Sequence, residues 1–110
     1  MTNLPLDQKL AFDTEMSVSA PFTGVPQLLG VLSNEPVMIL FKNQSTVPAF
    51  LADNDGSTKG TTMGASEEII LDCRANHGYA SNMGFPICTP FFVTGTGGTG
   101  SFKVSIIYAK

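Results

Sequence analysis

The stretch Phe102-Lys103-Val104-Ser105-Ile106-Ile107-Tyr108 alternates large apolar side chains with others at a period of two. Successive side chains of a β-strand point to opposite faces of its sheet, whereas a helix would need apolar residues three and four apart. This stretch is therefore predicted to be a strand that buries Phe102, Val104, Ile106 and Tyr108 on one face and turns Lys103, Ser105 and Ile107 toward the other.

The same spacing recurs through the rest of the chain, and no amphipathic helical spacing is sustained anywhere. Ile69, Leu71 and Cys73 alternate with residues that are mostly polar, which predicts a strand with one solvent-exposed face. Residues 37–41 are apolar on both faces, so they predict a central strand or one covered by another chain. Further strands are predicted over 15–20, 25–32, 47–53 and 90–94, and Pro26 with Gly30 indicates an edge strand or a bulge in the second of these. About seven strands predict an all-β chain folded as an antiparallel β-sandwich.

The chain of 110 residues has the length of a single domain. A domain of this size has a thin core, so we expect a partner subunit to add burial, and we expect the protein to oligomerise. The sandwich is predicted over residues 13–110, and residues 1–12 stand apart from it. That first segment carries Leu4, Leu6, Leu10 and Phe12. It is either a frayed terminus or an arm that packs on a neighbouring subunit, and the sequence favours neither.

Charge is sparse in this sequence. Charged residues are 14% of the chain, the formal net charge is -3, and the 6 Lys and Arg residues are scattered. Nucleic-acid binding requires several phosphates to be neutralised together, so we expect no nucleic-acid partner. The N-terminal residues show no basic run followed by an apolar stretch, and the longest strongly apolar run is far below the ~20 residues of a membrane helix. We therefore expect neither a signal peptide nor a membrane segment.

Two motifs suggest small ligands but lack the required context. Residues 95–100, Gly-Thr-Gly-Gly-Thr-Gly, match the glycine pattern of dinucleotide sites, yet a strand follows them in place of the helix that would meet the pyrophosphate. Residues 53–57, Asp-Asn-Asp-Gly-Ser, resemble the start of a calcium loop, but Gly64 stands where the bidentate acid is needed. We predict a hairpin loop and a turn, and Asn43-Gln44-Ser45 is predicted to be a turn whose side chains bond their own backbone.

No catalytic set is visible. His77 is the only histidine and lies in a polar Asn-His-Gly sequence, so a solvated loop residue is the expected role. A nucleophilic Cys–His pair would have to use His77, and a zinc site would have to combine it with both cysteines and an acid, but the sequence has none of the spacings typical of zinc ligands. Cys73 and Cys88 are predicted to be buried free thiols, with a disulfide as the alternative. We expect no enzyme activity, cofactor or metal.

The irregular segment from residue 74 to residue 90 is long for a compact domain, which favours a functional or interface role. Tyr79 and Phe85 within it, with Phe91 or Phe92 beside it, are candidates for contact with a protein or a sugar. Core packing explains Phe91 or Phe92 equally well, since neighbours on a strand face opposite ways.

Several stretches together resemble small structural proteins of tailed phages. They are 40–45 (Leu-Phe-Lys-Asn-Gln-Ser), 47–55, 64–72 (Gly-Ala-Ser-Glu-Glu-Ile-Ile-Leu-Asp), and 91–93 with 100–108. In those proteins a strand ends in an Asn-rich turn that leads to a second strand, a Gly-x-x-Glu-x-hydrophobic sequence begins a third, and a Gly-rich hairpin precedes the last. The resemblance covers about two-thirds of the chain.

The resemblance implies a capsid cement, or decoration, protein. It implies a jelly-roll-like sandwich, often a homotrimer, made in the host cytoplasm and carried on the capsid surface, where it binds the major capsid protein. Leu4, Leu6, Leu10, Phe12, Tyr79 and Phe85 are the interface residues predicted for it. The alternative is a receptor- or carbohydrate-binding module of a phage tail or head fibre, which Tyr79 and Phe85 would serve.

Overall fold

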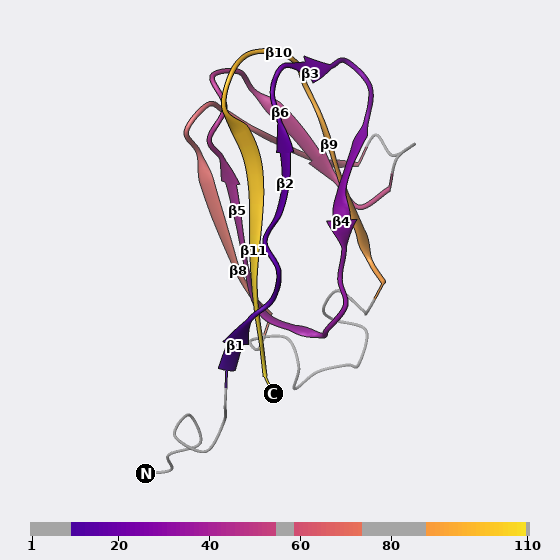
Figure 1. Cartoon of the computed structure of the whole chain (residues 1–110), viewed down its shortest axis with the longest axis vertical. Helices are drawn as coiled ribbons and strands as arrows, with labels where there is room; N and C mark the ends of the chain where they lie inside the picture. The colour runs from indigo at the N-terminus through magenta and orange to yellow at the C-terminus, as the bar shows by residue number, and fades with distance from the viewer. Residues whose placement is uncertain (1–9, 55–58, 74–87, 110) are drawn as a thin grey trace.

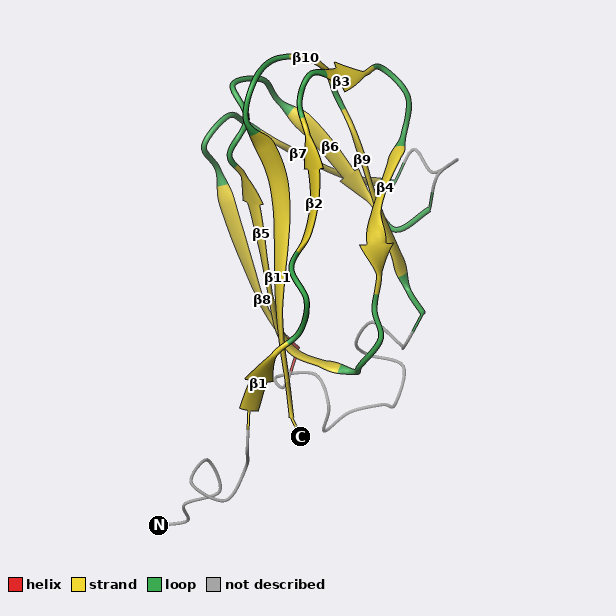
Figure 2. Cartoon of the chain, viewed as in Figure 1, coloured by secondary structure: helices red, strands yellow, loops and turns green. Residues whose placement is uncertain are grey.

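The computed structural model describes residues 10–54, 59–73 and 88–109, and the regular elements within them are β-strands (Figure 2). The first sheet has the order β1-β11-β5-β8, and β2 pairs with β11 as well, farther along the same edge as β1. Its strands are β1 (Leu10–Phe12), β2 (Met16–Ser19), β5 (Pro36–Asn43), β8 (Glu68–Asp72) and β11 (Ser101–Ala109).

The second sheet has the order β4-β9-β6-β7 and packs against the first (Figure 1). It is built from β4 (Gln27–Val31), β6 (Ala49–Ala52), β7 (Gly60–Met63) and β9 (Pro90–Thr94). A short ladder between β3 (Phe22–Thr23) and β10 (Thr96–Gly97) lies at one end of the molecule. All the ladders are antiparallel, so the predicted antiparallel β-sandwich is confirmed.

The topology is that of a jelly roll. Four antiparallel pairs are nested in sequence, the earliest strand with the latest: β2 with β11, β4 with β9, β5 with β8, and β6 with β7. The ladders β5–β11 and β6–β9 join these pairs into the two sheets. A long double ladder rolled up in this way is the arrangement seen in viral capsid and lectin domains.

The core lies between the two sheets and follows the predicted alternation. In β11, Phe102, Val104 and Ile106 are buried, while the residues between them are only half-buried. The rings of Phe41 from the first sheet and Phe91 from the second meet edge to face, with centroids 5.4 Å apart. Fully burying an aliphatic or aromatic side chain contributes about 1.5–3 kcal/mol, so these residues supply much of the stability.

Other strand predictions are also confirmed. β5 lies between β11 and β8, as its two apolar faces indicated. β4 is an edge strand, and its register with β9 shifts between Leu28 and Gly30, where a bulge was one of the expectations. Four strands were not predicted: β1, β3, β7 and β10. β1, β3 and β10 have only two or three residues, too few to show a period, and β7, Gly60-Thr61-Thr62-Met63, buries only Met63 and so lacks the two-residue apolar period.

The turn between β7 and β8 gives the Gly-x-x-Glu sequence a structural role. The backbone N–H of Gly64 donates to a carboxylate oxygen of Glu67 at 2.9 Å, and the N–H of Glu67 donates back to the carbonyl oxygen of Gly64 at 3.1 Å. Ser66 between them adopts a positive φ of 68°. The reciprocal bonds hold the tight turn that starts β8.

Candidate interaction surface

The outer face of the first sheet carries an unusual group of apolar side chains. The strand registers place Phe12 opposite Ile107 and Ile107 opposite Met38, and the adjacent row places Leu40 opposite Ile70. Directly opposed residues share one face of a sheet, and Met38 and Leu40 are two positions apart on β5, so these five side chains form one patch, which we call the outer patch. Asp72, opposite Met38, and Ser105, opposite Leu40, complete the two rows. Phe12 is 75% exposed and Ile70 is 59% exposed.

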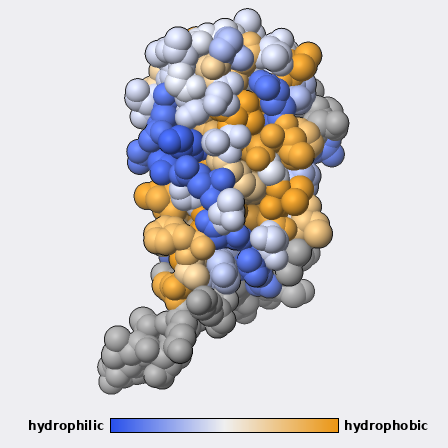
Figure 3. All heavy atoms as spheres, in the orientation of Figure 1, coloured by the Kyte–Doolittle hydropathy of each residue, from blue (hydrophilic) through white to orange (hydrophobic). Residues whose placement is uncertain are grey.

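A charged band borders the outer patch on the same face of the sheet. The next row of the register that points outward contains Lys103, Lys42 and Glu68. The ammonium group of Lys42 lies 3.8 Å from a carboxylate oxygen of Glu15, and the hydroxyl of Ser105 donates to the same oxygen at 3.1 Å. Figure 3 shows hydrophilic and hydrophobic surface side by side on the visible face. An apolar centre with a charged border is typical of a protein-binding surface.

Leu10 and Phe12 are the two predicted interface residues that the structure describes. They lie on β1, which pairs with the last residues of β11, and Leu10 is 50% exposed. Leu4, Leu6, Tyr79 and Phe85 lie outside the described residues. The arm predicted over residues 1–12 therefore includes three residues that form a strand on the first sheet.

Ile70 and Ile107 were not predicted to be interface residues, whereas Met38 and Leu40 lie in residues 37–41, for which cover by another chain was one of the two expectations. The sequence does indicate apolar side chains on the outer face of this strand, because residues 37–41 are apolar at every position and only one face of a strand can point to the core. The strand registers were needed to show that the excess apolar residues of three strands and Phe12 fall on the same outer face.

A cleft of about 470 Å³ opens between the two sheets on the side of β7 and β8. Its wall is apolar, and Lys59 and Thr61 belong to its lining together with polar residues of the turn after β6. The apolar lining consists chiefly of Phe41, Leu51, Ile69, Leu71 and Phe91.

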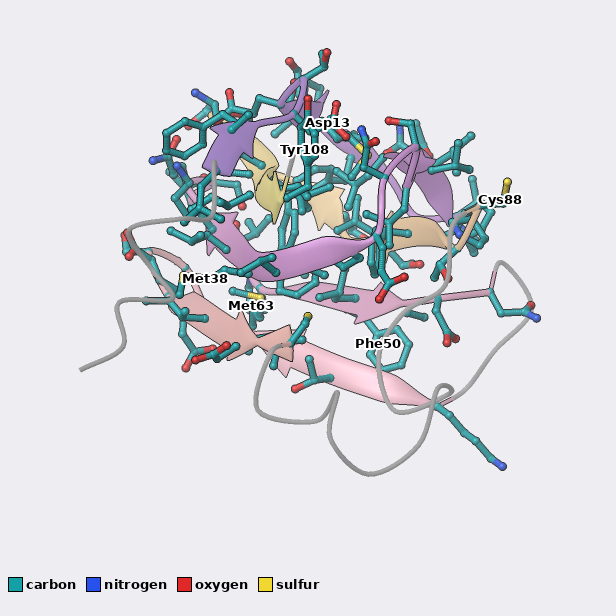
Figure 4. The ribbon with its side chains drawn as sticks, turned by 90° about the horizontal axis from the view of Figure 1, so that it is seen from below. Asp13, Met38, Phe50, Met63, Cys88 and Tyr108 are labelled. Carbon is teal, nitrogen blue, oxygen red and sulfur yellow. The ribbon has the colours of Figure 1, made fainter. Side chains whose placement is uncertain are left out.

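The two cysteines have different environments. Both are free thiols, as predicted; Cys73 is buried, and its pKa is raised by burial and secondarily by the charge of Asp72. The prediction that Cys88 is also buried was wrong, since Cys88 is exposed. It precedes β9 with a φ of 75°, and its N–H donates to the carbonyl oxygen of Leu32, which turns its sulfur outward (Figure 4).

Phe91 and Phe92 divide between the core and the surface. Phe91 is buried, whereas Phe92 is half-buried on the outer face of the second sheet, opposite Leu28. Core packing thus accounts for Phe91, and Phe92 is the one of the pair that faces outward.

The motifs with possible small-ligand roles fall in turns. The hairpin loop predicted over residues 95–100 was wrong, because these residues connect β9 in the second sheet with β11 in the first and contain β10. No helix follows the glycines, since they open into β11. Asp53 and Asn54 follow β6, while Gly64 lies beyond the far end of β7. Residues 55–58 and His77 lie outside the described residues.

Among residues 10–54, 59–73 and 88–109, no group of three or more His, Cys, Asp or Glu residues is arranged to hold a metal ion. Within the same ranges, no helix is long and apolar enough to cross a membrane.

Comparison with known proteins finds a similarity in fold to a solved structure and no similarity in sequence. No known family matches the chain, and no curated protein matches its sequence. Among solved structures, the chain is similar to one described under the words "Bacillus endospore appendages form a novel family of disulfide-linked pili", with a TM-score of 0.50 and 10% sequence identity over 94% of this chain and 90% of that one. At this identity the likeness shows a shared β fold.

Proposed function

We propose that the chain is a non-enzymatic structural protein of a virus particle, a cement protein that binds the lattice of the major capsid protein. The observation that carries the proposal is the outer patch, an apolar sheet face with Phe12 and Ile70 more than half exposed. A sheet normally covers its apolar face, so this one is best accounted for as a contact with another protein.

Two further considerations support this role. The jelly-roll topology recurs in capsid domains, although it also hosts lectins and other functions, so it fits the role without specifying it. A cement protein is present in many copies on a shell, so identical contacts through this face would act together and need not each be strong. The homotrimer implied by the phage resemblance remains part of the proposal.

The decisive experiment is co-sedimentation with shells. The purified chain is mixed with shells of the major capsid protein encoded in the same genome, and bound protein is measured after centrifugation. Ile70→Lys places a charge in the outer patch at an exposed site, and we expect it to reduce binding at least ten-fold. Leu28→Lys is the matched control, because Leu28 is 53% exposed on the outer face of the other sheet. Equal binding by both variants, or no binding by the unaltered chain, would reject the proposal.

The pilus likeness supports a second candidate, a subunit of a protein filament. The solved structure with the similar fold is described as belonging to disulfide-linked pili. The exposed Cys88 gives this candidate one available thiol. Electron microscopy of the concentrated protein under oxidising conditions separates the two candidates, since filaments that dissolve with a reductant favour the second.

A further inference from the structure

The side of the sandwich formed by β7 and β8 is more open than the opposite side. On the opposite side, β2 lies so close to β4 that a side chain at Gly30 would collide with Met16, and the pocket lined by these two residues has a volume of about 180 Å³. On the open side, the cleft of about 470 Å³ separates the edges of β7 and β8, with Phe41 and Phe91 in its lining. Apolar pockets of this size are large enough to receive side chains of a ligand or a peptide.

β8 borders this cleft as an edge strand, and no strand among residues 10–54, 59–73 and 88–109 pairs with its outer side. It pairs with β5 on one side and is the last strand in the order of its sheet. Natural edge strands are commonly protected by a proline, a bulge or a charge near the middle, and in β8 the charges stand at the ends, as Glu68 and Asp72. Ile69 and Leu71 point toward the cleft and are only half-buried. An extended segment added beside β8 would continue the sheet and fill the cleft.

Residues 2–9 have the pattern that such a segment requires. Leu4 and Leu6 are two positions apart, so in an extended strand both would point to one side, about 6.6 Å from each other. Pro5 between them favours an extended conformation at Leu4. An added outer strand tolerates a proline whose missing N–H faces away from the sheet.

The sheet order indicates which copy supplies the segment. β1 and β8 are the two ends of the order β1-β11-β5-β8, a separation of three strand spacings, or about 14 Å. Leu6 is four residues from Leu10 and can lie at most about 14 Å from it. A strand added beside β8 would lie one spacing farther, about 19 Å from β1, so Leu6 of the same molecule cannot reach it and a second copy must supply the segment.

We propose that the cleft between β7 and β8 receives residues 2–9 of a second copy of this chain as an extended strand beside β8, with Leu4 and Leu6 against its apolar wall. This contact is separate from the outer patch and does not depend on the shell as partner. A chain that binds shells but never self-associates would overturn this inference and the homotrimer, and would leave the proposed binding to the capsid shell standing.

The test measures self-association of the full-length protein by sedimentation equilibrium. We expect the unaltered chain to exceed the 11.6 kDa of one copy as its concentration rises. The double variant Leu4→Ser with Leu6→Ser should weaken association at least ten-fold, and the pair Leu4→Ile with Leu6→Ile should retain it. A synthetic peptide of residues 1–9, added in excess, should return the unaltered chain to a single-copy mass.

A second pair of variants tests the cleft itself. Thr61 belongs to the cleft lining and Thr62, the next residue, faces the other side of β7. Thr61→Trp should block association and peptide binding, while Thr62→Trp should leave both unchanged, which controls for the effect of a tryptophan on the fold. A single-copy mass at all concentrations, or equal effects of the two tryptophans, would overturn the proposal. The proposal would also be overturned if the protein is monomeric and the Leu4→Ser and Leu6→Ser changes lower its thermal stability. That result would mean that residues 2–9 pack on their own molecule.

Discussion

The side-chain amide of Asn43 donates a buried hydrogen bond to the carbonyl oxygen of Met63 at 3.0 Å, which ties the end of β5 in one sheet to the end of β7 in the other. The same amide nitrogen reaches the carbonyl oxygens of Val47 and Gly64, and its oxygen accepts bonds from the N–H and hydroxyl of Ser45. Asn43 is therefore a buried junction between the turn after β5 and the turn after β7.

Replacing Asn43 should be among the most destabilising polar substitutions in the chain. Asn43→Ala leaves buried carbonyl groups and Ser45 without their partner, and each unsatisfied buried group costs about 1–3 kcal/mol. We expect a loss of about 3 kcal/mol in the free energy of urea unfolding. Gln44→Ala, at the exposed neighbouring position, should change it by less than about 0.5 kcal/mol. Similar losses from both would show that the junction is not holding the sheets together.

Substitutions at two glycines of the 95–100 segment distinguish the cost of a left-handed backbone from the cost of a steric clash. Gly97 and Gly100 both have positive φ, 68° and 88°, but only Gly100 lies so close to the carbonyl oxygen of Gln44 that an added methyl would collide with it. Gly97→Ala should cost about 1–2 kcal/mol for a left-handed residue, and Gly100→Ala should cost about 1–3 kcal/mol more. Thermal denaturation of the two variants checks this order, and a reversed order would contradict the packing described for this turn.

The thiols should react at very different rates. Cys88 is exposed, whereas Cys73 is buried and its raised pKa lowers the fraction of reactive thiolate. With a maleimide at neutral pH, we expect one label per folded chain, lost in Cys88→Ser, and a second label only after denaturation. Two labels on the folded chain, or none without reductant, would contradict the free and unequal thiols seen here.

Asp13 should make a small contribution to the pH dependence of stability. Its carboxylate accepts bonds from the side chain of Asn34, the N–H of Thr14 and the hydroxyl of Ser33, which together lower its pKa. A lowered folded-state pKa gives stability that is present above the usual value near 4 and is lost as pH falls through the folded value.

The expected size of this effect is less than about 1 kcal/mol, because Asp13 is largely solvated and solvent screens its charge. Unfolding measured from pH 6 down to pH 2 should show a smaller decline for Asp13→Asn than for the unaltered chain. If stability declines equally with falling pH in Asp13→Asn and in the unaltered chain, Asp13 does not contribute to the loss of stability in acid.

The sequence predicts those parts of the fold that depend on local alternation. β11 was placed by its two-residue apolar period and β5 by its continuous apolar run, and the bulge of β4 was anticipated from Gly30 and Pro26. β7 was missed because its side chains are mostly exposed, so burial leaves no period in its sequence. The nested strand pairing that defines the jelly roll joins residues far apart in the chain, and periodicity carries no information on partners.

The candidate surface depends on the same long-range information. Asn43 was predicted to bond its own turn, and its oxygen does so through Ser45. Its bond to Met63, twenty positions away, follows only once β5 and β7 are placed. In the same way, Phe12 was predicted to be an interface residue because it is an apolar residue of the N-terminal segment. That Ile107 and Met38 lie beside it is shown only by the pairing of β1, β11 and β5.

The central claim is that this protein covers a capsid shell through an exposed sheet face. The measurement that tests it most directly is the molar ratio of this protein to the major capsid protein in purified particles, obtained by quantitative mass spectrometry against labelled standards. The account predicts a copy number comparable to that of the capsid subunits. Absence from the particle, or only a few copies at a tail or vertex, would contradict it.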